Sequence, residues 1–597
     1  MKTAPQVLHD VFGYATFRPG QEEVIALLSG GENVLAVMPT GAGKSICYQV
    51  PALMSGRLSI IVSPLVALMD DQVAALRTNG VDVACIHSGL SREDNVDVWR
   101  KVMAGEIKLL YLSPERLMTD RMLMALRDLE PAMFVVDEAH CISKWGTSFR
   151  PDYEQLSRLP ELFPHSVIAG FTATADKATR ADIAQKLFRG QGRTIVHGFD
   201  RPNLRLAAAH RSSWKPQLLT FLADKQGQAG IIYCLSRKFT DEVAAFLLAE
   251  GLNAIAYHAG QDSEQRKVNQ DRFMSEDAVV MVATIAFGMG IDKPDIRYVC
   301  HLNLPGSVEA YYQEIGRAGR DGLPAETLLL HSAGDVALRR QFIENEGDDA
   351  HRRREHKRLD SLMAYCEAPS CRRVTLLSYF DEVSAPCGNC DNCLTPAVLV
   401  DATARAVMLL GAVRGSGQMF GAGHIIDILR GAETQKILER RHHNLPGYGK
   451  GKAWPKDDWQ GFIRQVIAGG YLLVNIEKFG GLNITARGAA LLMGEEKFLH
   501  REHQARPASA AAKKRAAPDV GAGDVTLLSE LKKLRLGIAR ARNVPAYVVF
   551  PDSTLIEMAR ERPSDLDQMS AIGGVGPKKL KEFGPTFLRA ITEYVGG

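Results

Sequence analysis

The sequence predicts an α/β protein in which two tandem parallel-sheet lobes are followed by mainly helical segments. Short β-rich runs alternate with amphipathic helical stretches from about Val34 to Ala173, and a second such series follows Pro202. This alternation is typical of a parallel sheet that helices cover on both faces. The length of 597 residues also exceeds what one hydrophobic core organises, so about three to four domains are expected.

Composition and charge narrow the class of protein. With 46% hydrophobic and 24% charged residues, the chain suits globular domains, and no apolar run approaches the roughly 18 residues that cross a bilayer. The first residues lack the features of a secretory signal, so we expect a cytoplasmic protein without a membrane partner. The net charge of +3 is small, but basic clusters at 351–358 and 436–456 supply the local charge that a nucleic-acid backbone requires. Alone, these clusters are better interpreted as solvated helix faces.

A phosphate-binding loop is predicted at residues 38–45, MPTGAGKS, because they follow the apolar run VLAVM and precede a helical pattern. Lys44 would neutralise the β and γ phosphates of ATP, and the Ser45 hydroxyl would ligate Mg²⁺. Glycines let the loop backbone approach the phosphates closely. Met38 stands where the generic pattern has its first glycine. The residues expected to bind the nucleotide here are Thr40, Gly41, Gly43, Lys44 and Ser45.

Two acids follow the next buried strand, in FVVDEAH. Asp137 would hold Mg²⁺ through its hydration shell, while Glu138 would orient and deprotonate the attacking water. The alternative is that the two acids belong to an ordinary surface turn. The phosphate loop upstream makes this interpretation much weaker.

A pair of arginines lies in QEIGRAGRDG, residues 313–322 of the second series. A helical backbone would present Arg317 and Arg320 on one face. Because a phosphoryl-transfer transition state needs such cations, either arginine can act as a finger if the second lobe faces the nucleotide. The sequence therefore predicts an ATP-driven motor whose hydrolysis depends on lobe closure.

Four of the ten cysteines form the pattern C-x15-C-x2-C-x2-C. Cys371, Cys387, Cys390 and Cys393 at this spacing suit tetrahedral Zn²⁺ in a structural site. An iron–sulfur centre is the competing interpretation, although the fourth cysteine and the proline of the tight ferredoxin run are missing. Cys366 competes with Cys371 as the first ligand.

Together with FGYATFRPGQ at 12–21 and TATA at 172–175, these motifs resemble superfamily 2 helicases, and specifically the RecQ family, nearly from end to end. The resemblance implies two RecA-like lobes and an ATP-dependent 3′–5′ DNA helicase of recombination, repair, replication and the SOS response. It favours zinc, with Cys371 as a ligand. It also implies nucleotide contacts by Tyr14, Arg18, Gln21 and Gln313, with Gln21 on the adenine edge.

Contacts with DNA are also implied by the resemblance. HCISKWGTSFRPDY, residues 140–153, is similar to the aromatic-rich loop of the family, in which Trp145, Phe149 and Arg150 would contact unpaired bases. A predicted hairpin near Phe479 would part the strands, although an ordinary exposed turn predicts the same sequence. In the terminal module, GVGPKKLKEFG at 574–584 either binds phosphates or belongs to a helix bundle with solvated lysines.

The resemblance divides the chain into six segments. They are the ATP-binding RecA-like lobe 1–203, the second lobe 204–335, the zinc-binding subdomain 336–398, the winged-helix (RQC) domain 399–500, a linker 501–523 and the HRDC domain 524–597. Single-stranded DNA and duplex junctions are the expected partners, with single-strand-binding protein and other repair proteins, for a monomer at the bacterial nucleoid. The rival hypotheses are an RNA helicase and a catalytically silent DNA-binding scaffold. The presence of Lys44, Asp137, Glu138 and Arg320 argues against a scaffold.

Overall fold

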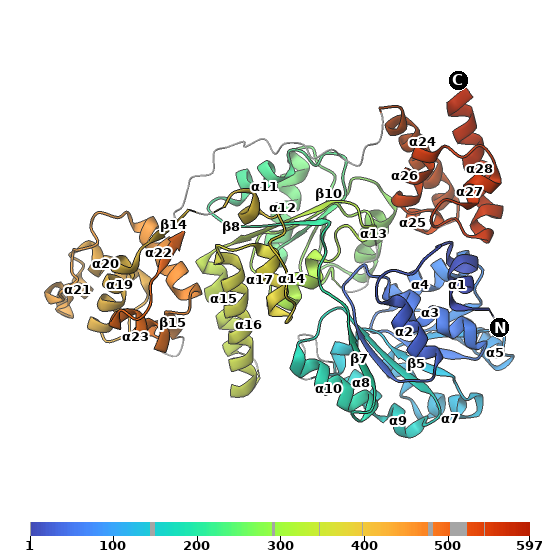
Figure 1. Ribbon diagram of the computed structural model, residues 1–597, viewed down its shortest axis with the longest axis horizontal. Coiled ribbons are helices and arrows are strands. Elements are labelled where there is room, and N and C mark those ends of the chain that lie inside the picture. Colours follow the sequence, from blue (N-terminus) through green and yellow to red (C-terminus); the bar gives the residue numbers. More distant parts are fainter. Residues whose placement is uncertain are drawn as a thin grey trace.

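The structure is a computed structural model, and it describes residues 2–143, 150–288, 293–345, 347–396, 398–475, 481–501, 522–542 and 544–596. Two sheet-containing lobes occupy its centre, with one mainly helical domain on the far side of the second lobe and another above the first (Figure 1). Within these residues, no helix is both long and apolar enough to span a membrane.

The first lobe is built on a seven-stranded parallel sheet in the order β3-β4-β2-β5-β6-β1-β7. Its strands are β1 (Val34–Val37), β2 (Ser59–Val62), β3 (Val83–Ile86), β4 (Leu109–Leu112), β5 (Met133–Val136), β6 (Val167–Thr172) and β7 (Arg193–Val196). Strands β1 to β5 are buried along their whole length, as expected for a parallel sheet between two helical layers.

The helices of the first lobe precede and connect these strands. They are α1 (Ala4–Val7), η1 (Leu8–Phe12), α2 (Gln21–Ser29), α3 (Lys44–Ser55), α4 (Val66–Thr78), α5 (Arg92–Met103), α6 (Pro114–Leu117), α7 (Asp120–Leu129), η2 (Ala139–Ile142), α8 (Pro151–Glu154), η3 (Gln155–Arg158), α9 (Leu159–Leu162) and α10 (Lys177–Phe188). Helix α5 begins at a serine cap, since the Ser91 side chain accepts from the Asp94 N–H.

The second lobe contains a six-stranded parallel sheet in the order β10-β11-β9-β12-β13-β8. The strands are β8 (Leu204–His210), β9 (Gly230–Tyr233), β10 (Ala254–Tyr257), β11 (Val280–Ala283), β12 (Tyr298–His301) and β13 (Ala325–His331), and the helices are α11 (Trp214–Leu222), α12 (Arg237–Ala249), α13 (Ser263–Ser275) and α14 (Val308–Ile315). The strand order repeats that of the first lobe, with β10 in the place of β3 and β9 in the place of β2. In such sheets, ligands bind beyond the carboxyl ends of the strands.

The cysteine-containing subdomain shares its core with the second lobe. It consists of α15 (Ala333–Glu344), α16 (Asp349–Glu367), α17 (Arg372–Tyr379) and α18 (Asp391–Leu394). Buried Tyr365 and Leu376 belong to the same hydrophobic core as Leu329 of β13. The Arg372 side chain is fully buried, and its Nε donates to Asp391 Oδ1 at 3.0 Å. The subdomain is therefore an extension of the motor.

The next domain has its own core, which includes Trp459 and Phe462. Its helices are α19 (Thr403–Gly415), α20 (Ala422–Arg430), α21 (Gln435–Glu439), η4 (His442–Asn444), α22 (Lys456–Ala468) and α23 (Ala486–Met493). The antiparallel pairs are β14 (Leu399–Asp401) with β17 (Leu499–Arg501), and β15 (Leu472–Asn475) with β16 (Gly481–Ile484). The predicted hairpin is thus present, while its tip lies outside the described residues.

The terminal domain is all-helical in the described residues and rests on the first lobe (Figure 1). Its helices are α24 (Ala522–Arg542), α25 (Ala546–Val549), α26 (Asp552–Glu561), α27 (Leu566–Ser570) and α28 (Pro577–Gly596). The Gly574 N–H donates to the Gly13 carbonyl at 3.0 Å, and Lys578 Nζ donates to the Arg77 carbonyl at 2.8 Å. Part of the predicted phosphate-binding segment therefore contacts protein in this arrangement.

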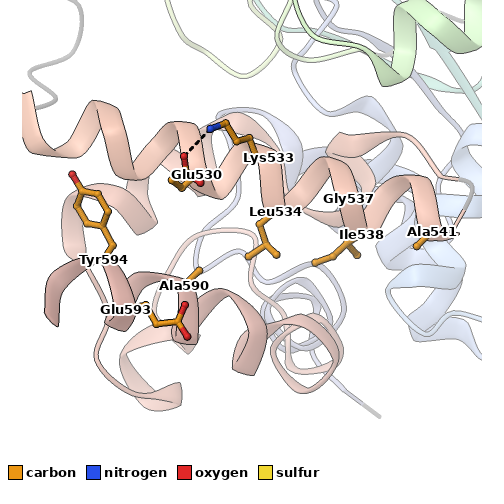
Figure 2. Close-up of a pocket in the computed structure, with 9 residues that line it drawn as sticks. All are labelled: Glu530, Lys533, Leu534, Gly537, Ile538, Ala541, Ala590, Glu593 and Tyr594. Carbon is orange, nitrogen blue, oxygen red and sulfur yellow. Dashed lines mark hydrogen bonds and ion pairs between the residues drawn. The ribbon is translucent and has the colours of Figure 1, made fainter. Parts of the chain in front are cut away.

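A groove lies between α24 and α28 of the terminal domain. Figure 2 shows apolar side chains along it, among them Leu534, Ile538 and Ala590, and an ion pair between Lys533 and Glu530. Lys533 is the one cation of its lining and is paired with Glu530, so the groove lacks the several cations that converge on a polyphosphate. The site of the chemistry is found instead between the two lobes.

Candidate active site

The predicted phosphate loop connects β1 to α3. Gly41 and Gly43 adopt φ angles of 84° and 76°, a region that favours glycine, and Gly43 caps α3. Lys44 is the first residue of α3, and its Nζ donates to the Met38 carbonyl at 3.3 Å. Ser45 follows it in the first helical turn. This strand, loop and helix arrangement directs backbone N–H groups and the positive end of a helix at one point.

The segment expected to grip adenine packs against this loop. Gln21 Nε2 donates to the carbonyls of Ala42 and Gly43 at 2.9 and 3.1 Å, and Arg18 Nη1 donates to the Gly41 carbonyl at 2.6 Å. The Gln21 amide is therefore engaged with the loop, and a Cβ on Gly43 would lie 2.6 Å from Gln21 Nε2, so this amide would have to shift to admit one. Tyr14, which precedes Arg18 and Gln21 in the same segment, is 41% exposed to solvent.

The two acids lie at the carboxyl end of β5, where both are partly buried and the Glu138 side chain is 22% exposed. Glu138 has a φ of 49°, which turns the chain sharply after the strand. Its Oε2 lies 3.3 Å from Nδ1 of His140, so the histidine orients the carboxylate. Burial and the adjacent Glu138 raise the pKa of Asp137, whereas His140 and then Lys44 lower the pKa of Glu138 against the effect of burial. Glu138 is thus held ionised, as a proton acceptor must be.

The arginine-bearing segment of the second lobe meets the phosphate loop. It follows α14 and carries Arg317, which is buried, and Arg320. A Cβ on Gly316 would lie 3.1 Å from Thr40 Oγ1, and a Cβ on Gly41 would lie 3.5 Å from Cα of Arg320. The two segments therefore face each other across the boundary between the lobes with no space for an added side chain at Gly316.

Side chains also connect the acids to the second lobe. His140 Nδ1 lies 3.0 Å from Thr172 Oγ1, and that hydroxyl donates to the Thr174 carbonyl at 3.1 Å. The Thr174 hydroxyl in turn accepts a 2.6 Å hydrogen bond from Nε2 of Gln313. Gln313, which was expected to contact the nucleotide, is engaged with the first lobe in this structure.

Several residues at this cleft were missed by the sequence analysis, namely His140, Thr174, Arg201 and Asn203. The sequence analysis used TATA, residues 172–175, only as a family motif. It used Pro202 only as the point where the second series of strands and helices begins. The sequence feature that pointed to Thr174 was its position shortly after a buried strand, which it shares with Asp137. Arg201 carried no signal, because its partners are backbone carbonyls.

The four predicted cysteines converge, with every ligand atom within 4.8 Å of the others. Cys371 Sγ lies 3.5 Å from Cys387 Sγ and 3.8 Å from Cys390 Sγ. Sulfurs arranged tetrahedrally at about 2.3 Å from one zinc ion lie roughly 3.8 Å apart, so the geometry fits a single ion. In a polynuclear iron–sulfur cluster, the ligands are shared among several iron atoms, which separates the sulfurs more widely. Cys366 is buried but is not part of this group.

Backbone donors surround the sulfurs as well. The N–H groups of Arg372 and Cys387 donate to Cys390 and Cys371 at 3.4 and 3.3 Å. Such donors stabilise thiolate charge and fix the ligands from outside the metal.

A second group with metal-binding side chains is better explained without a metal. Asp70 Oδ1 lies 3.0 Å from His87 Nε2 and 3.4 Å from Cys85 Sγ. The second lobe repeats the pair with Asp241 and His258 at 3.0 Å, and there Ala256 replaces the cysteine. In both lobes the other ring nitrogen accepts a backbone N–H, at Gly89 and Gly260, so the proton resides on the nitrogen facing the acid. These pairs shape the loops after β3 and β10.

Of the four residues predicted to contact DNA, the described part of the structure includes Arg150. Trp145, Phe149 and Phe479 lie outside the described residues. Arg150 Nη1 donates to the Pro64 carbonyl at 3.0 Å, in the loop after β2. The Tyr153 hydroxyl donates to the Asp137 carbonyl at 3.0 Å, so the described end of this segment is hydrogen-bonded to the backbone of the acid pair.

The basic cluster at 351–358 is largely neutralised by acids. His356 Nε2 lies 2.7 Å from Glu344 Oε1, and Arg358 pairs with Glu309 and Glu355. Arg352 pairs with Asp349. These three side chains therefore stabilise the packing of α16, and their charge is shared with neighbouring acids.

The fold and the cleft define a two-lobed motor that uses a nucleotide at the lobe interface. Family models match along the chain as DEAD/DEAH box helicase (18–183), helicase conserved C-terminal domain (214–322), RecQ zinc-binding (333–394), RQC domain (396–509) and HRDC domain (524–591). The chain is 41% identical over 594 residues to an ATP-dependent DNA helicase RecQ of Haemophilus influenzae, covering 99% of this chain and 96% of that protein. It is 36% identical over 594 residues to the ATP-dependent DNA helicase RecQ of Bacillus subtilis, covering 99% and 98%. The chain belongs to the RecQ family of ATP-dependent DNA helicases.

Proposed function

We propose that the chain unwinds DNA by moving 3′ to 5′ along one strand, with ATP hydrolysed in the cleft between its two lobes. The contact of the phosphate loop with the arginine segment supports this most directly, since one nucleotide would touch both lobes. The polarity rests on the family resemblance. Hydrolysis would then alter the grip of one lobe relative to the other.

In this mechanism Lys44 binds the β and γ phosphates, and Ser45 and Asp137 would hold Mg²⁺. The chemistry that a bound Mg²⁺ would supply there is neutralisation of the negative charge that develops during phosphoryl transfer. Glu138 orients the attacking water and accepts its proton, and the contact with His140 keeps its carboxylate aimed. The partly buried surroundings of the acids strengthen these electrostatic interactions.

The second lobe supplies the remaining cations. Arg317 and Arg320 stabilise the charge on the γ phosphate when the lobes close. Tyr14, Arg18 and Gln21 hold the adenine end, the amide of Gln21 positioning the phosphate loop as well. Through its hydrogen bond to Thr174, Gln313 couples the nucleotide site to the second lobe.

The four-cysteine centre holds a structural zinc ion, in this proposal, through Cys371, Cys387, Cys390 and Cys393. The matched RecQ zinc-binding family and the convergence of four sulfurs around one point support it. Because all four coordination positions are filled by the protein, the ion contributes stability to the subdomain and no chemistry.

DNA is held, we propose, along the aromatic-rich segment, where Trp145 and Phe149 stack on unpaired bases and Arg150 positions the loop after β2. Phe479 would part the duplex at the tip of the β15–β16 hairpin. The six domain boundaries, the monomeric state, the contact with single-strand-binding protein and the place at the nucleoid stay predictions.

One experiment tests the activity as a whole. Unwinding is measured on matched DNA and RNA duplexes that carry a 3′ or a 5′ single-stranded overhang, with and without ATP. We expect strand separation only of DNA with a 3′ overhang and only with ATP. Equal unwinding of RNA would favour the RNA helicase, a 5′ requirement would overturn the polarity, and binding without ATP turnover would favour the scaffold.

A further inference from the structure

We infer that Arg201 is a positioning residue for ATP hydrolysis, which holds the arginine segment of the second lobe in register with the phosphate loop. It lies in the junction that joins the two lobes, between β7 and β8. This inference rests on the proposed function, because it assigns to Arg201 the alignment of Arg317 and Arg320.

The guanidinium of Arg201 bonds to both lobes at once. Its Nη1 donates to the Thr40 carbonyl in the phosphate loop and, at 3.3 Å, to the Gly316 carbonyl. Its Nη2 donates to the carbonyls of Ala318 and Gly319 at 2.9 and 2.8 Å. One side chain thus fixes the backbone on either side of Arg317 against the loop that receives the phosphates.

Only an arginine can make this set of bonds. Its planar fork presents five N–H donors in fixed directions, whereas the lysine ammonium is a compact charge that cannot span carbonyls of two lobes. Burial, and then the charges of Arg320 and Arg18, lower the pKa of Arg201 to about 10, so it remains charged at neutral pH. Those neighbours show that cations gather around the loop, where a polyphosphate would relieve their repulsion.

The neighbouring Asn203 supports the same segment. Its Nδ2 donates to the carbonyls of Gly319 and Leu323 at 2.8 and 2.9 Å, and its Oδ1 lies 3.4 Å from Nε of Arg201. The Nη1 and Nη2 donors of Arg201 are occupied by backbone carbonyls and its Nε by Asn203, although Nη1 lies only 3.2 Å from where a Cβ on Gly41 would be. Arg201 therefore acts through the arginines that it places and does not itself touch ATP.

Loss of these bonds should affect the chemical step more than nucleotide binding. The phosphate loop, Lys44 and the adenine-binding segment all belong to the first lobe, so they can still hold ATP without the second lobe. The arginines needed in the transition state would be misplaced, and a displacement of about 1 Å can lower a rate on the order of a hundredfold.

The test compares Arg201→Ala and Arg201→Lys with the control Arg205→Ala in the full-length chain. Arg205 lies on β8 in the same stretch of chain, and its ion pair with Glu326, at 3.2 Å, is half-exposed and away from the cleft. DNA-stimulated kcat and KM for ATP, the Kd of a fluorescent ATP analogue and thermal unfolding are measured for each. We expect kcat to fall on the order of tenfold or more in both Arg201 variants, with the Kd changed less than about threefold. Arg205→Ala should match the wild type.

Free guanidinium ion, added at millimolar concentration to Arg201→Ala, should restore part of kcat, because it can occupy the vacated carbonyl cradle. The inference fails if both Arg201 variants keep wild-type kcat, or if the loss lies entirely in KM and Kd. If Arg201→Ala does not fold, Arg201→Lys decides by the same criteria. A failure of the proposed function itself would appear differently, as wild-type protein without ATPase activity.

Discussion

Gln313 Nε2 donates a 2.6 Å hydrogen bond to Oγ1 of Thr174, and this bond crosses the boundary between the two lobes. Gln313 belongs to α14, one turn before the arginine segment, and Thr174 follows β6. From Thr174, contacts continue through Thr172 and His140 to the carboxylate of Glu138. The position of the second lobe is thus tied to the orientation of the acid proposed to activate water.

Gln313→Ala and Thr174→Val should each lower DNA-stimulated kcat roughly fivefold, since a hydrogen bond of this kind contributes about 1 kcal/mol. If the two side chains act through their mutual bond, the double variant should be no slower than either single variant. Steady-state ATPase assays on the four proteins measure this coupling. Fully additive losses would show that the bond does not transmit the effect.

Lys44→Ala should abolish ATP hydrolysis while DNA affinity stays within about twofold, because the lysine faces the phosphates and not the DNA. Turnover by a phosphate-release assay and DNA binding by fluorescence anisotropy measure the two properties separately. Lys101→Ala, on the exposed face of α5, is the matched control and should behave as wild type. Wild-type turnover of Lys44→Ala would refute the assignment of the phosphate loop.

Elemental analysis of the purified chain should find one zinc per molecule. Cys390→Ser should lose it, because this buried sulfur is part of the four-cysteine group and lies 3.8 Å from Cys371 Sγ. Cys366→Ser removes a buried thiol outside the group and should keep the metal. Iron in place of zinc, or a metal-free folded subdomain, would contradict the proposed centre.

The terminal domain should lose stability in acid because of one carboxylate. Asp552 pairs with Arg535 at 2.7 Å and with Lys532 at 2.6 Å. Burial favours the neutral acid, but the charges of these two residues outweigh it and lower the pKa of Asp552 to about 2. A carboxyl whose pKa is lower in the folded than in the unfolded state stabilises the fold above the unfolded value of about 4, and this stabilisation is lost as the pH falls toward 2.

Amide hydrogen exchange over α24 and α26 in the full-length chain measures this effect. Asp552→Asn should reduce protection at pH 7 by about 2 kcal/mol and remove most of the dependence on pH between about 4 and 2. Asp567→Asn, at an exposed position of the same domain, should retain both. Unchanged protection in Asp552→Asn would show that the ion pairs do not stabilise the domain.

The sequence predicted most of the strands whose two faces are both buried, because such strands are continuous apolar runs. β1, β2, β4, β5 and β6 of the first lobe and β9 to β12 of the second were predicted in this way. The sequence analysis did not single out β3, β7, β8 or β13, although β3 is buried along its whole length and β13 along most of it. Edge strand β7 is mostly exposed, and β8 alternates buried with half-buried residues, so neither has that pattern.

The residues of the candidate site also fall into two groups, those that the sequence predicted and those that it did not. The phosphate loop, the acid pair and the cysteine spacing are local patterns, and the sequence alone brought each of them into view. The contacts of Arg201 join positions 161 and 115 residues away, and its acceptors are carbonyls that every residue possesses. No side-chain pattern encodes such a contact, so only the assembled lobes reveal it.

The junction between the lobes is braced by the cysteine-containing subdomain. Arg373 Nη1 lies 2.9 Å from Asp200 Oδ1, and the Glu382 carboxylate accepts from the Phe199 N–H. Arg373 follows Cys371, a proposed zinc ligand, and Arg372, which is fully buried. The position of the Arg373 side chain therefore depends on the folding of this subdomain. We expect removal of the proposed zinc ion to loosen the junction between the lobes. Protein that is oxidised at these cysteines or treated with a chelator should then hydrolyse ATP slowly, although every residue of its nucleotide site is unchanged.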